Sequence, residues 1–150
     1  MAKNILLPIT GIKQRPIHCG PACIEMILKF YGYVNVDQVI VGKDLRVKFS
    51  RGCYPYQVIK YLKRFNIIAE KSKKIEDIER ISEGNPIVLG QMDHFMLLIG
   101  REGNEYFYID PATGRRNKDT LDYFKREMID IIIITKVEKP DGRKGKNKRK

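Results

Sequence analysis

The chain has 150 residues, of which 43% are hydrophobic, and a formal net charge of +11 at pH 7. This length is typical of one globular domain with its own core. No run of residues approaches the roughly eighteen apolar side chains that span a bilayer, and the N-terminus lacks the apolar core of a secretory signal. We therefore expect no transmembrane segment and a cytoplasmic protein. Three cysteines, an odd number, favour free thiols over a disulfide framework.

Much of the positive charge lies in residues 139–150, KPDGRKGKNKRK. Seven basic residues and one acidic residue give this segment 7 − 1 = +6, which leaves 11 − 6 = +5 for the rest of the chain. Because the segment is too polar to form a core, we predict a disordered basic tail after one domain of residues 1–138. Such a tail allows weak contact with RNA, DNA or anionic lipid, although its ordinary role is solubility.

The first half of the chain predicts an extended arm and then helices. Residues 4–17 contain two prolines and a glycine, which indicate an arm and not a helix. A buried helix begins at CGPAC (19–23), since Pro21 suits a first turn and Gly32 is typical of a helix end. Shorter helices are predicted at 36–42, 56–65 and 75–81.

The second half predicts an antiparallel sheet. Short segments rich in β-branched and aromatic residues, separated by turn-forming residues, occur at 86–90, 94–100, 105–110 and 130–135. The link 102–104 between the second and third of these segments is short enough for a hairpin. An N-terminal helical half packed on a C-terminal antiparallel sheet is an α+β fold.

Cys19 stands where the arm meets the first helix. A helix start gathers unpaired amide groups and the positive end of the helix dipole, which favour an anion such as a thiolate. Gly20 leaves room for a substrate, and the backbone amide of Cys19 is suited to hold the oxyanion of a carbonyl under attack. Since a buried structural cysteine is the commoner alternative, Cys19 needs a base to qualify as a nucleophile.

His94 is the candidate base. It begins an apolar strand, from which its ring can project toward the helix start. The other histidine, His18, is adjacent to Cys19 and points elsewhere, so we interpret it as a loop residue of the cleft. A lone strand histidine is more often structural, which makes a third group necessary.

Asp110 is the candidate for that third group. It ends the strand 105–110, and pairing of this strand with 94–100 would bring the carboxylate beside His94. There it would fix the imidazole tautomer and stabilise the imidazolium, as in a catalytic triad. An ordinary Asp-Pro turn is the alternative.

The remaining thiols and metal binding are weaker candidates for function. Cys23 lies inside an apolar run and is predicted to be buried, and Cys53 lies in a turn and is predicted to be structural or incidental. Two cysteines three residues apart on one helix, without a second ligand pair, make a poor zinc site. We therefore expect no metal and no cofactor.

Three segments carry a resemblance to a known family: HCGPACIEMILKFYG (18–32), GQMDHFMLLIG (90–100) and EYFYIDPATG (105–114). Together with TLDYFKREMIDIIIIT (120–135), they resemble the papain-like peptidases that process bacteriocins by removing double-glycine leaders. The resemblance spans most of residues 14–135. It implies a papain-like fold and a cysteine peptidase that cuts a peptide or leader after small residues such as Gly-Gly, through a thioester.

By position, the resemblance implies that Cys19 is the nucleophile, His94 the base and Asp110 the orienting acid. The family also has a glutamine that completes the oxyanion hole with the amide of the catalytic cysteine. That glutamine usually lies six residues before the cysteine, where this chain has Lys13, whereas Gln14 lies five before it. A small shortening of the arm would deliver Gln14 to this role.

Many family members are the first domain of an exporter with membrane spans and an ATPase. This chain shows neither, so we expect a standalone domain whose partner is a peptide or protein substrate. Two alternatives stay open: a catalytically silent peptide-binding module of the same fold, and a thiol acyltransferase or deamidase. Nucleic-acid binding through the basic tail is a third.

Overall fold

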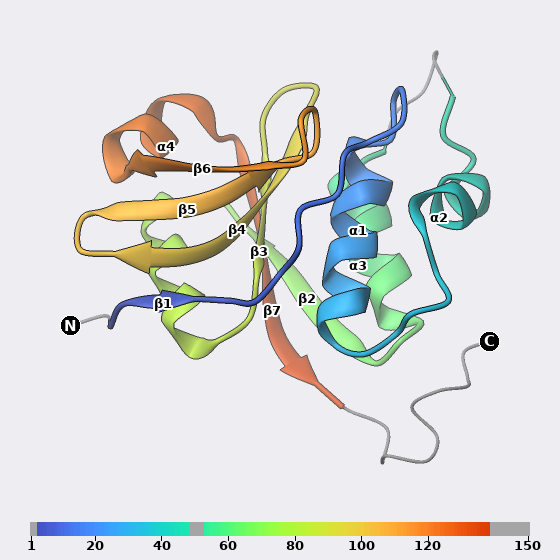
Figure 1. Cartoon of the computed structure of the whole chain (residues 1–150), viewed down its shortest axis with the longest axis horizontal. Coiled ribbons are helices and arrows are strands. Elements are labelled where there is room, and N and C mark those ends of the chain that lie inside the picture. The colour runs from blue at the N-terminus through green and yellow to red at the C-terminus, as the bar shows by residue number, and fades with distance from the viewer. Residues whose placement is uncertain (1–2, 49–52, 139–150) are drawn as a thin grey trace.

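The computed structural model describes residues 3–48 and 53–138 (Figure 1). The predicted tail 139–150 lies outside the described residues. The elements follow in the order β1 (Ile5–Leu6), α1 (Cys19–Phe30), α2 (Gln38–Leu45), α3 (Pro55–Lys63), β2 (Ile67–Ser72), η1 (Ile75–Glu83), β3 (Ile87–Gly90), β4 (Phe95–Glu102), β5 (Glu105–Asp110), β6 (Arg115–Thr120), α4 (Leu121–Glu127) and β7 (Asp130–Val137).

The strands form one antiparallel sheet in the order β2-β7-β3-β4-β5-β6, and β1 pairs with β4. The predicted hairpin is confirmed: β4 and β5 pair with Leu97 opposite Ile109, and Gly103 in the tight turn has φ +60°. This positive φ favours glycine because it has no Cβ. The hairpin brings the start of β4 beside the end of β5.

The helices α1, α2 and α3 lie together on one side of the sheet, with α1 between the sheet and α2 (Figure 1). Most of α1 is buried, as its many apolar residues predict. Local signals start its neighbours: the Asp37 carboxylate accepts a hydrogen bond from the amide of Ile40 at the start of α2, and Pro55 opens α3. The predicted α+β class is therefore confirmed.

Three strands were not predicted from the sequence, and one helix differs in type. The short strand β1 lies in the segment that was expected to be an extended arm. The strand β6 (Arg115–Thr120) is polar along its whole length and gains its conformation by pairing with β5 at the sheet edge. The strand β2 (Ile67–Ser72) is half polar and is fixed by pairing with β7. The segment predicted as a helix at 75–81 is a 3₁₀ helix, η1, with isoleucines facing the core at Ile78 and Ile81.

The helix α4 covers the other end of the sheet. Its Phe124 is fully buried and meets the rings of Tyr106 and Tyr108 edge to face, with ring centroids 5.9 and 5.5 Å away. This packing holds β5, the strand that ends at Asp110, against its neighbours.

Candidate active site

Cys19 is the first residue of α1 and is half-buried. No side chain caps this helix start, and its first turn carries no acidic residue. The positive end of the helix dipole is therefore uncompensated beside the thiol, an arrangement that favours a thiolate.

His94 and Asp110 lie together, as the predicted hairpin requires. His94 Nε2 is 2.6 Å from Asp110 Oδ1. The amide of Ala112 donates a second hydrogen bond to the same oxygen at 3.0 Å, which fixes the carboxylate at the turn after β5. Because Nε2 faces the carboxylate, Nδ1 is the ring nitrogen left for a partner on the opposite side.

That partner is Cys19. Its hydrogen bond is the largest cause that raises the pKa of His94 from 6.5 to about 9. Burial lowers the pKa, and the hydrogen bond to Asp110 raises it further. The imidazolium of His94 is thus the favoured form at neutral pH.

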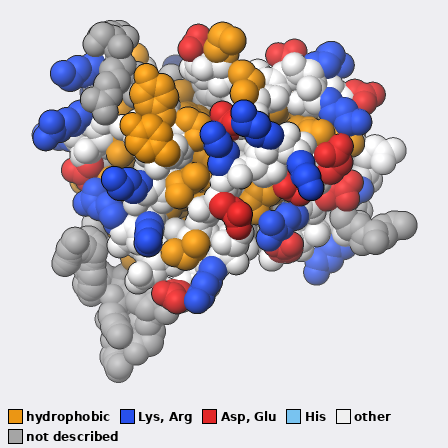
Figure 2. All heavy atoms as spheres, turned by 180° about the vertical axis from the view of Figure 1, so that it is seen from behind, with side chains coloured by type: hydrophobic (Ala, Val, Ile, Leu, Met, Phe, Trp, Pro, Cys, Tyr) orange, Lys and Arg blue, Asp and Glu red, His pale blue; other side chains and the backbone are white. Residues whose placement is uncertain are grey.

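A cleft of about 610 Å³ runs between the helical layer and the sheet at this point. Its helical side includes Gln14, Ile17, Cys19, Lys48, Cys53 and Tyr54, and its sheet side includes Gly90, Met92, Asp93, His94, Phe95, Ile129 and Asp130. Large apolar side chains stay exposed at its rim, among them Met92 at 82%. Tyr54 stacks on Tyr56, and Figure 2 shows hydrophobic side chains gathered over the helical half of the rear face.

Gln14, and not Lys13, lies in the cleft. The Gln14 side chain lines it, and its buried Oε1 has no hydrogen-bond partner among the described residues. Lys13 is exposed. The structure thus brings Gln14 into the same cleft as Cys19, while the oxyanion role of Gln14 stays a prediction.

A buried hydrogen-bond network fixes the arm on both sides of Gln14. Gln38, which is 7% exposed, accepts a hydrogen bond from the amide of Arg15 at 2.7 Å and donates one to the carbonyl of Lys13 at 2.9 Å. The amide of Gln14 itself donates to the carbonyl of Pro111 at 2.7 Å. The arm is therefore anchored to α2 and also to the turn that carries Asp110.

Glu25 of α1 completes this network. Its buried carboxylate accepts a hydrogen bond from the amide of Gln38 at 2.9 Å and pairs with Lys29 at 2.6 Å. The Lys29 ammonium group and the Gln38 amide offset the free-energy cost of burying the Glu25 carboxylate. Sequence reasoning missed Gln38 and Glu25, because no local pattern marks a helix residue that anchors a distant arm.

The other singled-out residues have mixed outcomes. Cys23 is fully buried, as predicted, and burial raises the pKa of its thiol. Cys53 does not lie apart from the site: it lines the cleft, and a Cβ added to Gly20 would be 2.8 Å from its Sγ. His18 lines a neighbouring pocket and packs against Gly42, so its predicted place in the cleft was wrong.

Within residues 3–48 and 53–138, no group of three or more His, Cys, Asp or Glu side chains is placed to hold a metal ion. Over the same described part of the chain, no helix has the length and apolar character needed to cross a membrane.

The fold is similar to that of several solved peptidase domains. A double glycine motif protease from an AMS/PCAT transporter, solved in complex with the leader peptide, has a TM-score of 0.71 and 23% identity, and the match covers 89% of this chain and 97% of that one. A C39-like peptidase from Bacillus anthracis has a TM-score of 0.72 and 17% identity, covering 91% and 100%. The peptidase domain of Streptococcus ComA, a bifunctional ABC transporter involved in quorum sensing, has a TM-score of 0.71 and 16% identity, covering 84% and 97%.

No curated protein sequence matches the chain. The family comparison is decisive, because residues 12–139 match the Peptidase C39 family, a range that contains Cys19, His94 and Asp110 together with both layers of the cleft. The chain belongs to the Peptidase C39 family.

Proposed function

We propose that this protein is a cysteine peptidase that cuts a peptide or leader segment through Cys19, His94 and Asp110. One observation carries the proposal: the imidazole of His94 lies between the Asp110 carboxylate, 2.6 Å away, and the thiol at an uncapped helix start. Nucleophile, base and orienting acid in hydrogen-bonded sequence are the arrangement that thiol peptidases use.

In the proposed reaction, the Cys19 thiolate attacks the carbonyl carbon of the substrate. The Cys19 amide and the Gln14 side-chain amide donate hydrogen bonds to the resulting oxyanion. The tetrahedral intermediate collapses as the carbon–nitrogen bond breaks, and the His94 imidazolium gives its proton to the leaving amine. Water then gives a proton to the neutral His94 as its oxygen attacks the thioester carbonyl, the carbon–sulfur bond breaks, and the Cys19 thiolate and the His94 imidazolium are restored. Asp110 keeps Nε2 of His94 engaged throughout.

Packing beside the nucleophile supports cleavage after small residues such as Gly-Gly. A Cβ added to Gly20 would be 2.8 Å from Cys53 Sγ and 3.4 Å from the Phe95 ring. Cys53 and Phe95 thus occupy the room that Gly20 was expected to leave for a substrate, and little space next to the thiol is left for a bulky substrate side chain. A structural neighbour solved with a leader peptide also supports a peptide substrate.

The direct test uses Cys19→Ala and Cys19→Ser with peptides that contain a Gly-Gly pair. Wild-type protein should release two fragments and should be alkylated by iodoacetamide at Cys19, and both variants should lose cleavage and that labelling. Cys23→Ala is the matched control, because its thiol is buried. Full cleavage activity in Cys19→Ala would contradict the proposal.

Two alternatives from the same fold are separated by the products. A silent binding module would bind the peptides without cutting them. An acyltransferase or deamidase would pass the acyl group to an added amine or would release ammonia, and mass spectrometry distinguishes each product from hydrolysis. The hydrogen-bonded series of Cys19, His94 and Asp110 favours hydrolysis over a module that only binds peptides.

A further inference from the structure

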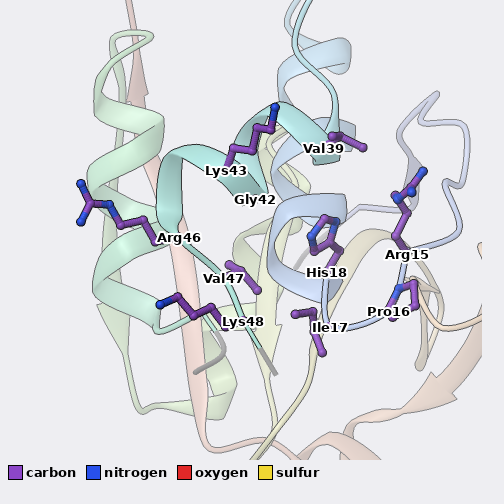
Figure 3. Close-up of a pocket in the computed structure, with 10 residues that line it drawn as sticks. All are labelled: Arg15, Pro16, Ile17, His18, Val39, Gly42, Lys43, Arg46, Val47 and Lys48. Carbon is purple, nitrogen blue, oxygen red and sulfur yellow. The ribbon is translucent and has the colours of Figure 1, made fainter. Parts of the chain in front are cut away.

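A second pocket, of about 600 Å³, lies beside the catalytic cleft (Figure 3). It is formed by the arm just before Cys19, by α2 and by the segment that follows α2. Its floor is the ring of His18, which fits against α2 because Gly42 has no side chain: a Cβ there would lie 2.7 Å from His18 Nε2. The pocket is thus built by close packing and is not a chance surface hollow.

The pocket is strongly basic. Arg15, Lys43 and Lys48 line it from three different segments, and all three are exposed. None of them forms an ion pair with any described residue. Figure 3 shows Arg15 and Lys43 on two sides of the His18 ring, whereas Arg46 points away from it. Cations gathered without counter-charges create a positive potential that attracts an anionic ligand.

This pocket continues the catalytic cleft, because Ile17 and Lys48 line both. A substrate chain that leaves the cleft at this end passes directly into the pocket. The sheet side of the cleft carries two acidic side chains besides His94, namely Asp93 and Asp130, of which Asp130 is paired with Lys71 at 3.9 Å. Asp93 repels an acidic substrate segment, and the cations of the pocket attract it.

The lining favours an acidic peptide over other anions. Val39 and Val47 give the pocket apolar walls that suit the methylene groups of glutamate side chains. The cations are spread around the rim on separate segments, which matches carboxylates spaced along a chain better than a single phosphate. The described lining residues include no Tyr, Phe or Trp on which nucleic-acid bases would stack.

We propose that this pocket is a specificity subsite that binds an acidic segment of the peptide substrate, through Arg15, Lys43 and Lys48. The proposal rests on the proposed peptidase function and extends it, because it names the chemistry of substrate residues beyond the cleavage point.

The test measures binding apart from cleavage. Fluorescein-labelled peptides with a Gly-Gly pair carry a glutamate-rich segment on one side of the pair or on the other, and matched peptides carry glutamine instead. Their affinities for Cys19→Ala are measured by fluorescence anisotropy. The same measurement is made after adding Arg15→Glu and Lys43→Glu. The control adds Lys73→Glu and Lys125→Glu, which change the net charge equally at exposed lysines outside the pocket.

One of the two acidic peptides should bind more tightly than its glutamine counterpart. Charge reversal in the pocket should weaken that binding about tenfold, as expected for two exposed charge pairs replaced by repulsion. The glutamine peptide and the control variant should show little change. Equal affinity for acidic and neutral peptides, a preference that survives the pocket variant, or no binding of any peptide would overturn the subsite.

Two further measurements keep the subsite separate from the peptidase function. Alkylation of Cys19 by iodoacetamide in the pocket variant with Cys19 intact should match wild type, which shows that the nucleophile is undisturbed. If wild type binds the acidic peptide through the pocket but cuts no peptide, the peptidase proposal fails and the subsite stands. A labelled single-stranded RNA that binds the pocket more tightly than the acidic peptide would overturn the peptide assignment.

Discussion

His94 takes its protonation behaviour from two neighbours, Cys19 and Asp110. Its pKa of about 9 means that the imidazolium persists well above neutral pH. The proposed reaction needs this imidazolium to protonate the leaving amine. His94, the proposed base of the second half of the reaction, is thus already protonated in the resting site.

This environment predicts a falling limb in the pH profile. The value of kcat/KM should decrease as pH rises through about 9, where His94 loses its proton. Asp110→Asn removes a negative charge that raises this pKa, so the limb should move to lower pH. Initial rates with a fluorogenic peptide, measured across the alkaline range, check both points. If kcat/KM of Asp110→Asn fell at the same pH as in wild type, the assignment of Asp110 as the partner of His94 would be contradicted.

The same shift has a consequence for stability. The folded-state pKa of His94 lies above the ordinary value of 6.5, so its contribution to stability is fully present below about pH 6.5 and is lost as pH rises through about 9. The thermal midpoint should therefore fall over this window by more in wild type than in His94→Gln, as followed by circular dichroism. Parallel curves for the two proteins would argue against the raised pKa.

Gln14 is predicted to act only while an oxyanion exists. Gln14→Ala should lower kcat by about a hundredfold to a thousandfold, the usual loss for one oxyanion donor. Alkylation of Cys19 by iodoacetamide should not change, because that reaction forms no oxyanion. Lys13→Ala is the matched control and should keep kcat, since the Lys13 side chain is exposed. A larger loss in Lys13→Ala than in Gln14→Ala would reverse the assignment.

At the scale of the elements, the helix α2 holds the arm through Gln38. Its side chain is bound to the backbone of Lys13 and of Arg15, the two neighbours of Gln14. A helix that is remote from the chemistry thereby fixes the position of a predicted oxyanion donor.

Gln38→Ala should reduce kcat because the arm around Gln14 loses its anchor, and it should cost about 1–3 kcal/mol of stability through unpaired backbone groups. In a Gln14→Ala background, the same change should have no further effect on kcat. Tyr61→Phe, which removes the 2.7 Å hydrogen bond to Asp44, is the control that should affect stability alone. Additive effects on kcat would show that Gln38 does not act through Gln14.

At the scale of the whole molecule, the sheet holds the chain up to the last described residues. The last strand pairs Val137 with Ile67, and the amide of Glu138 donates to the carbonyl of Asn66 at 3.0 Å. Residues up to 138 are therefore held by the sheet, and the domain boundary at residue 138 stays a prediction.

Deletion of residues 139–150 should leave the thermal midpoint and kcat/KM unchanged while lowering the formal net charge from +11 to +5. The full chain should bind a polyanion such as heparin in a salt-dependent manner. The truncated chain should bind heparin more weakly and with a smaller dependence on salt. Calorimetry, peptide cleavage and heparin chromatography measure the three quantities. Loss of folding on deletion would move the domain boundary beyond residue 138.

The sequence by itself determined the elements whose patterns are local. The break before Cys19, the apolar faces of α1 and the alternation of short apolar strands were sufficient for the α+β fold and for the hairpin that pairs His94 with Asp110. These patterns are reliable because burial and turn chemistry act over a few residues.

The tertiary structure alone decided the features that depend on distant partners. The polar strand β6 exists because β5 lies beside it, and Cys53 joins the cleft because its side chain packs against Gly20. Gln14 reaches the cleft because Gln38 and Pro111 hold the arm, and His18 leaves the cleft because Gly42 accepts its ring. Contacts between residues far apart in the chain carry no periodic signature. The sequence therefore indicated that His94 and Asp110 would meet, but it did not indicate the shape of the cleft around Cys19.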